Sequence, residues 1–110
     1  MKAWVIFERL SAQSLDFVPA YRSLAAPSVK KYGGRYKTVS YNNPIIEGPV
    51  IDEGPKMISI IEFDSREDAE RWYRSPEYAS AIKTREGSVV NRAMIVDVNP
   101  PEYASKAGAV

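Results

Sequence analysis

The sequence predicts an α+β fold in which helices cover one face of a four-stranded antiparallel sheet. Its 110 residues suit one domain. Isoleucine and valine together number 19 against three leucines, and β-branched side chains favour strands over helices. Short apolar runs alternate with helical stripes along the chain in the order strand, helix, strand, strand, helix, strand.

The first strand and helix are expected in the N-terminal third. Residues 3–8 form a short run of β-formers that is apolar on both faces, which predicts a strand covered on both sides. Residues 16–32 carry apolar side chains at the spacing of a helical stripe. We expect Asp16 to cap this helix and Pro19 to lie in its first turn.

Proline and glycine decide how this helix continues and ends. Pro27 removes a backbone hydrogen bond to the carbonyl of Ser23, so a kink or a split is expected there. Gly33 and Gly34 follow the last residue of the stripe. Because glycine accepts the left-handed conformation common at helix ends, the helix is expected to stop at this pair.

Three more strands and a second helical region complete the pattern. Ser65 with Asp68 resembles a capping box that begins a helix to about residue 74. Ser75 and Pro76 restart the helix, and Gly87 ends it. The strands are expected at residues 35–41, 57–63 and 89–98, with a proline-rich connection at 42–56.

This order of elements is the split βαβ, or ferredoxin-like, motif. We expect residues 1–99 to form one such domain and residues 100–110 to form a C-terminal tail. Helices cover only one face of the sheet, yet the strands are apolar on both sides. The simplest cover for the second face is the sheet of a second copy, so a homodimer is expected.

Composition excludes several classes of function. With no histidine and no cysteine, the chain cannot form a His/Cys zinc site, a cysteine nucleophile or a Ser-His-Asp triad. Its net charge of +1 and short basic runs argue against nucleic-acid binding. No apolar stretch is long enough to span a membrane, and the N-terminus lacks a secretory signal, which predicts a cytoplasmic protein. We expect no cofactor. We also expect no metal, since acidic loop residues such as Glu47, Asp52 and Glu53 are usually only solvated.

Several motifs resemble one family of small proteins, the domain-of-unknown-function family numbered 1330 in the dimeric α+β barrel superfamily. They are KYGGRY at 31–36, IIEG at 45–48, IIEFDSREDAERWYRSPEYASA at 60–81 and a late Arg85. The resemblance covers roughly residues 3–98 and implies a ferredoxin-like dimer. Its recurring polar positions would be Arg35, Glu47, Glu62, Tyr73, Ser75, Tyr78 and Arg85. The longer connection at 42–56 and the tail depart from the family pattern.

Glu62 is the first candidate for chemistry, because it interrupts an apolar strand next to the expected position of Arg35. A carboxylate whose pKa and position are set by an arginine can act as an acid or a base. The alternative is an ordinary cross-strand ion pair. A salt bridge between Glu8 and Arg92 is expected at the opposite end of the sheet.

A second group of candidates lies in the helical region at 66–85. Trp72, Tyr73 and Tyr78 have the spacing of core residues, but members of the superfamily bind small molecules between helices and sheet. Tyr73 or Tyr78 could then present a hydroxyl to a ligand. Arg85 could bind a substrate carboxylate or simply stabilise the end of its helix.

Two functions fit these residues. One is a cofactor-independent enzyme of the isomerase or cyclase type on a small organic molecule, with Glu62 as acid or base. Arg35, Tyr73, Tyr78 and Arg85 would then bind the substrate. The other is a non-catalytic module for small-molecule binding or interaction, and whether the protein is an enzyme stays open.

Overall fold

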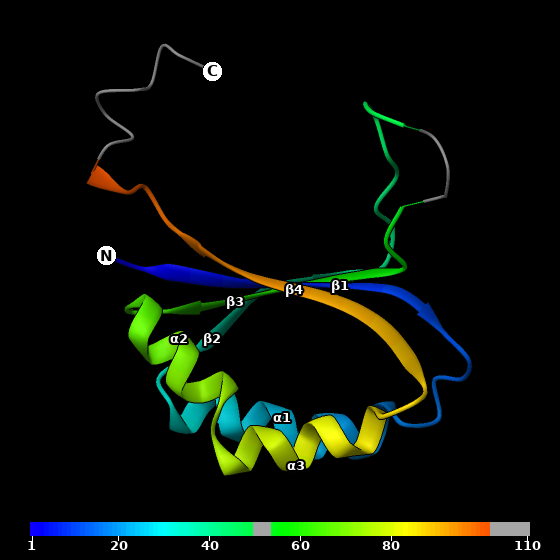
Figure 1. Cartoon of the computed structure of the whole chain (residues 1–110), viewed down its shortest axis with the longest axis horizontal. Coiled ribbons are helices and arrows are strands. Elements are labelled where there is room, and N and C mark those ends of the chain that lie inside the picture. Colours follow the sequence, from blue (N-terminus) through cyan, green and yellow to red (C-terminus); the bar gives the residue numbers. More distant parts are fainter. Residues whose placement is uncertain (50–53, 102–110) are drawn as a thin grey trace.

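The computed structural model describes residues 1–49 and 54–101, and in them four strands and three helices (Figure 1). The elements in chain order are β1 (Ala3–Ala12), α1 (Val18–Lys31), β2 (Arg35–Ser40), β3 (Met57–Phe63), α2 (Arg66–Tyr73), α3 (Pro76–Arg85) and β4 (Val89–Asp97). The predicted order of elements is therefore confirmed. Residues 50–53 and most of the predicted tail, 102–110, lie outside the described residues.

The four strands form one antiparallel sheet in the order β2-β3-β1-β4. This is the ferredoxin-like arrangement that the sequence predicts. The three helices of the described residues all lie on one side of the sheet, and none of them covers the opposite side (Figure 1). Among the described residues, no helix is long and apolar enough to cross a membrane.

Strand alternation divides the side chains between the two faces. Val5 of β1 lies opposite Ile61 and Ile95 in a row that faces the helices. The next position along β1, Ile6, lies opposite Ile60 and Met94 in a row that faces away from them. Both rows are apolar, as the sequence of the first strand predicts.

Aromatic rings form the centre of the core under the helices. Trp72 and Tyr78 are fully buried, with ring centroids 4.1 Å apart. The indole Nε1 of Trp72 donates to Ser28 Oγ at 3.0 Å, so its polar atom is satisfied inside the core. Burial of each such side chain contributes about 1.5–3 kcal/mol.

The predicted start signals of α2 and α3 are confirmed. Ser65 Oγ accepts from the backbone N–H of Asp68, and Ser75 Oγ accepts from that of Tyr78. Each serine satisfies one of the N–H groups that a helix N-terminus leaves free. Pro76 occupies the first turn of α3, where its missing donor costs nothing.

The prediction that Asp16 caps α1 is wrong. Phe17 occupies the cap position without a side-chain hydrogen bond. The N–H of Asp16 donates to Ser14 Oγ, and the N–H of Val18 donates to the carbonyl of Leu15. These two bonds form a turn that delays the start of the helix.

Pro27 does not split α1, which runs unbroken from Val18 to Lys31. Pro27 and Ser23 are both exposed, so the carbonyl that loses its donor lies on the solvent side. The predicted end at the glycine pair is confirmed, since Gly33 has a φ of +82°. The N–H of Gly34 donates to the carbonyl of Val29 at 2.9 Å, which closes the helix end.

The connection between β2 and β3 rises on the side of the sheet away from the helices (Figure 1). The side-chain amide of Asn43 donates to the carbonyls of Ser40 and Pro55, and these bonds join the two ends of the connection. The N–H of Lys56 donates to the carbonyl of Arg9, which joins the base of the connection to β1.

Candidate functional site

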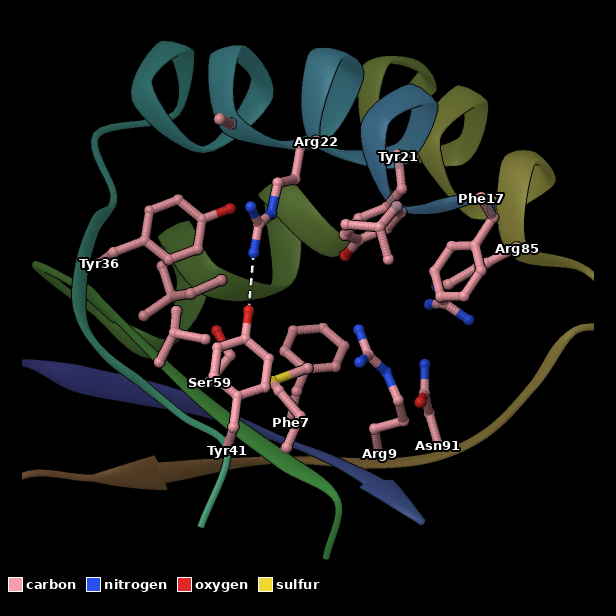
Figure 2. A pocket seen from close by; sticks show the side chains of 15 residues that line it. Phe7, Arg9, Phe17, Tyr21, Arg22, Tyr36, Tyr41, Ser59, Arg85 and Asn91 are labelled. Atoms are coloured by element: carbon pink, nitrogen blue, oxygen red, sulfur yellow. Dashed lines mark hydrogen bonds between the residues drawn. The ribbon is translucent and has the colours of Figure 1, made fainter. Parts of the chain in front are cut away.

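A cavity of about 260 Å³ lies between the helices and the sheet. Figure 2 shows side chains from α1, α3 and all four strands or their ends pointing into it. Its wall is largely aromatic and aliphatic, with polar groups at both ends. The lining residues are Phe7, Arg9, Phe17, Val18, Tyr21, Arg22, Ala26, Tyr36, Val39, Tyr41, Met57, Ser59, Ile61, Arg85 and Asn91.

Strand geometry explains which side chains reach the cavity. Arg9 follows Phe7 by two positions on β1, so both face the helices, and Asn91 of β4 lies opposite Arg9. On β2 a register shift between Tyr36 and Thr38 changes the alternation.

That register shift brings a second side chain of β2 to the cavity. Tyr36 lies opposite Ile61, and Val39 lies opposite Ser59. Positions 36 and 39 would point to opposite faces of a regular strand. With the extra residue between them, both line the cavity.

The cavity is strongly cationic. Three of the eight arginines in the chain, Arg9, Arg22 and Arg85, line it without any carboxylate beside them in the wall. Within the part of the chain that the structure describes, these three form no ion pair. Four others pair with carboxylates elsewhere: Arg35, Arg66, Arg71 and Arg92. The cavity therefore favours an anion.

Arg85 begins a chain of hydrogen bonds that ends in the cavity. Its Nη2 lies 3.5 Å from the hydroxyl of Tyr78, whose oxygen is 2.7 Å from that of Tyr21. Arginine can only donate, so Tyr78 accepts from Arg85, and either tyrosine can donate in the bond between the two hydroxyls. Tyr21, at the end of this chain, lines the cavity.

Both tyrosines in this chain stay protonated. Burial is the largest cause that raises the pKa of Tyr21, and the neighbouring Tyr78 raises it further. Burial likewise raises the pKa of Tyr78. The two hydroxyls therefore act as neutral donors, and neither is a base at neutral pH.

Two buried polar atoms at one end of the cavity lack a partner within the described residues, Nε of Arg85 and Oδ1 of Asn91. Arg9, Arg85 and Asn91 gather at this end beside Phe17 (Figure 2). A buried donor or acceptor without a hydrogen bond costs about 1–3 kcal/mol. Both residues line the cavity, and because neither atom is exposed to a water-sized probe, a ligand reaches them when these side chains rotate toward the cavity.

The opposite end of the cavity is bridged by side chains. Arg22 Nη2 of α1 donates to the hydroxyl of Tyr41 at 2.7 Å (Figure 2). Tyr41 directly follows β2 and begins the long connection. The bridge thus ties α1 to the base of that connection across the cavity.

Glu62, the predicted catalytic residue, lies on the other face of the sheet. It shares that face with Trp4, whose Nε1 donates to Oε2 at 2.9 Å. Arg35 Nη2 lies 2.9 Å from Oε1, and Lys2 Nζ lies 3.5 Å from it. The bond from Trp4 and those from Arg35 lower the pKa of Glu62 to about 2.

The predicted neighbourhood of Arg35 and Glu62 is therefore observed. Glu62 is an anion at neutral pH with several bound donors, and the sheet separates it from the cavity. The predicted salt bridge between Glu8 and Arg92 is also confirmed, with Oε2 and Nη2 2.7 Å apart.

The structure separates the predicted substrate-binding residues into groups. Tyr78 and Arg85 belong to the cavity chain. Tyr73 is 41% exposed and lines a second hollow between α2 and β4. In the described residues no cluster of His, Cys, Asp or Glu could hold a metal ion. Asp52 and Glu53 lie outside the described residues.

Sequence reasoning missed most of the cavity. It gave Arg9 and Tyr41 no binding role. Tyr21 was part of the expected helical stripe, and Tyr36 part of an expected strand. The usable signal was strand alternation, because Arg9 shares a face with the apolar Phe7 and an arginine there must leave the core or line a cavity.

A family model described as "Domain of unknown function (DUF1330)" matches residues 2–99. The chain belongs to this family. None of the curated proteins compared with the chain matches it.

Solved structures with the same fold are similar over most of the chain. A protein of unknown function from Rhodopseudomonas palustris has a TM-score of 0.69 and 22% identity, covering 91% of this chain and 84% of its own. A dimeric protein of unknown function with a ferredoxin-like fold from Bacteroides fragilis has a TM-score of 0.61 and 14% identity, covering 88% and 95%.

A third structure belongs to an enzyme. It is SnoaB, a cofactor-independent oxygenase from Streptomyces nogalater, with a TM-score of 0.59 and 10% identity, covering 90% of this chain and 93% of its own. At these identities the DUF1330 chain shares the ferredoxin-like fold with all three.

Proposed function

We propose that this DUF1330 protein binds a small organic molecule in the cavity between helices and sheet. The observation that carries the proposal is a cavity lined by aromatic rings and by three arginines that have no carboxylate partner among the described residues. Its volume of about 260 Å³ is near the lower end of the roughly 300–1,000 Å³ typical of ligand pockets. A molecule of one or two rings has the right size.

Turnover of that molecule is the second candidate function. It is supported by the neutral hydroxyl of Tyr21, a hydrogen-bond donor in the cavity wall. Such a donor stabilises negative charge that develops on a substrate oxygen. Among the described residues, the cavity wall contains no carboxylate, and the chain has no histidine and no cysteine. Cofactor-independent chemistry there would rest on stabilising an anion, without a side-chain base.

Catalysis by Glu62 stays a prediction. A residue whose pKa is near 2 is a weak base at neutral pH, because efficient proton transfer needs a pKa near the working pH. Unchanged turnover of an identified substrate by Glu62→Gln would exclude that role.

We also propose that the protein forms a homodimer through the face of the sheet that lacks helices. That face carries the apolar residues Trp4, Ile6, Ile58, Ile60, Met94 and Val96, with the ion pairs of Glu62 and Glu8 toward its two ends. An apolar face of this kind is unfavourable in water and packs well against a second sheet. The dimeric ferredoxin-like protein of similar structure supports this assembly.

Binding in the cavity can be tested by filling it. We would titrate benzoate, benzamide and benzylamine into the protein and follow the backbone amides by NMR. Ala26 lines the cavity but is exposed, so Ala26→Phe blocks the space without overpacking the core. Ala20, exposed on the same helix outside the lining, gives the control Ala20→Phe.

The proposal expects at least one compound to shift the amides of cavity residues. It expects Ala26→Phe, and not Ala20→Phe, to abolish those shifts. If no compound shifts cavity residues, or if binding survives Ala26→Phe, the proposed function is wrong.

A further inference from the structure

We propose that the ligand of this cavity is an aromatic carboxylic acid that also carries a hydrogen-bond donor. This inference rests on the proposed function and names the chemical class of its ligand. Four features of the cavity carry it: uncompensated positive charge, an unpartnered guanidinium Nε, an unpartnered amide oxygen and aromatic walls.

Charge selects an anion. Arg9, Arg22 and Arg85 line the cavity, and among the described residues none of them pairs with a carboxylate. Elsewhere in the molecule guanidinium groups do have such partners, as in the pair of Arg92 and Glu8 at 2.7 Å. These arginines would repel a cationic ligand, and a neutral ligand would leave their positive charges uncompensated.

The position of Arg85 selects a carboxylate. Its Nη2 is directed to Tyr78, whereas its Nε is buried and free. Two oxygens of a carboxylate match a guanidinium edge in a bidentate pair. A phosphate would bring a third oxygen to the end where the acceptor Asn91 Oδ1 lies (Figure 2). Two acceptors repel one another, so the planar acid fits better.

Asn91 selects the second group. Its Oδ1 is buried without a donor in the described part of the chain, and an amide oxygen is satisfied by an O–H or N–H group. Arg9 lies opposite Asn91 on the neighbouring strand, so the charge and the acceptor lie at one end of the cavity. A hydroxyl or amino group on the ring would satisfy the oxygen.

Aromatic walls select a flat body. Phe7, Phe17, Tyr21, Tyr36 and Tyr41 all line the cavity. Rings of these residues favour offset stacking or edge contacts with another ring. Arg9 lies over the ring of Phe17, with Cζ 5.6 Å from its centroid, so the cationic group and an aromatic face meet at this end.

The test compares ligands of equal size with the purified full-length protein. Benzoate, benzamide, benzylamine and phenyl phosphate differ in the head group, and the 2-, 3- and 4-hydroxybenzoates add the donor. Dissociation constants come from NMR titration or calorimetry. We expect benzoate to bind at least about ten-fold more tightly than benzamide and benzylamine, and one hydroxybenzoate to bind more tightly than benzoate.

Variants identify the groups responsible. Arg85→Met should weaken benzoate binding roughly ten-fold or more and leave benzamide binding nearly unchanged. Lys83→Met removes the same charge from an exposed position on α3 outside the lining and should change neither. Asn91→Ala should cancel the advantage of the hydroxybenzoate over benzoate.

The outcomes separate this inference from the proposed function. Cavity binding of benzamide, benzylamine or phenyl phosphate at least as tight as that of benzoate would overturn the carboxylate class and keep the cavity as a binding site. No gain from any hydroxyl, or a gain that survives Asn91→Ala, would overturn the donor. Absence of all binding in the cavity would overturn both proposals.

Discussion

The hydroxyl oxygens of Tyr21 on α1 and Tyr78 on α3 lie 2.7 Å apart, and this bond joins the two helices above the cavity. Both hydroxyls are largely shielded from water, so each loses solvent hydrogen bonds on folding. Tyr78 also accepts from Arg85, so the pair of hydroxyls is linked to a guanidinium in the cavity wall. We therefore expect this pair to contribute to stability and, under the proposed function, to ligand binding.

A double-mutant cycle measures this contact. We expect Tyr21→Phe and Tyr78→Phe each to lower the free energy of unfolding by about 1 kcal/mol. The double variant should lose less than the sum of the two, because the second change removes a bond that is already broken. Urea unfolding of the four proteins gives the coupling energy, and strictly additive losses would show that the hydroxyls do not interact.

Glu62 should make stability depend on pH in the acid range. Its pKa is lowered from 4.5 to about 2 in the folded protein. The carboxylate therefore stabilises the fold above about pH 4.5, and that contribution disappears as the pH falls toward 2. We expect Glu62→Gln to lower the melting temperature at pH 7, with the difference from the parent shrinking below pH 4.5.

The control for this experiment is Glu86→Gln, which removes an exposed carboxylate that follows α3. It should leave the melting temperature nearly unchanged at both pH values. A constant difference for Glu62→Gln between pH 7 and pH 2.5 would contradict the lowered pKa.

Gly34 should tolerate no side chain. A Cβ atom there would lie 2.7 Å from two atoms of the Phe63 ring and 2.9 Å from Val29 Cγ1. Because Phe63 is fully buried and cannot move away freely, Gly34→Ala should cost about 1–3 kcal/mol. Thermal unfolding checks this, and a melting temperature equal to that of the parent would show that α1 is not packed this closely on β3.

The proposed dimer predicts a matched pair of variants. Met94 is 40% exposed on the face without helices, and Leu24 is 41% exposed on α1. Met94→Arg should shift the protein to the monomer in light scattering, because an arginine would be buried between two sheets. Leu24→Arg should remain a dimer. A monomeric parent protein would exclude the assembly.

Local chemistry made most of the fold predictable from sequence. Serines 65 and 75 mark the starts of α2 and α3 through short-range hydrogen bonds, and such bonds are readable from neighbouring residues. The prediction that Asp16 caps α1 was wrong because Ser14, two residues earlier, accepts a hydrogen bond from the N–H of Asp16 and forms a competing turn. Pro27 does not split α1 because Pro27 and Ser23 are exposed, and the carbonyl that loses its donor lies on the solvent side.

The cavity was harder to predict, since its residues come from distant parts of the chain. Tyr21 and Tyr78 meet only after α1 and α3 pack, 57 positions apart. The register shift at Lys37 that turns Val39 toward the cavity has no clear sequence signal. By contrast, Arg35 and Glu62 were predictable neighbours, because strand order alone sets them opposite each other.

One titration tests the central claim, that ligand recognition takes place between helices and sheet. The tightest-binding hydroxybenzoate would be added to isotope-labelled protein while the amides of Arg9, Tyr21, Arg85 and Asn91 are followed by NMR. We predict saturable shifts at these residues that disappear in Ala26→Phe. Saturable shifts confined to the open face around Glu62, or no saturable shifts in the cavity, would contradict it.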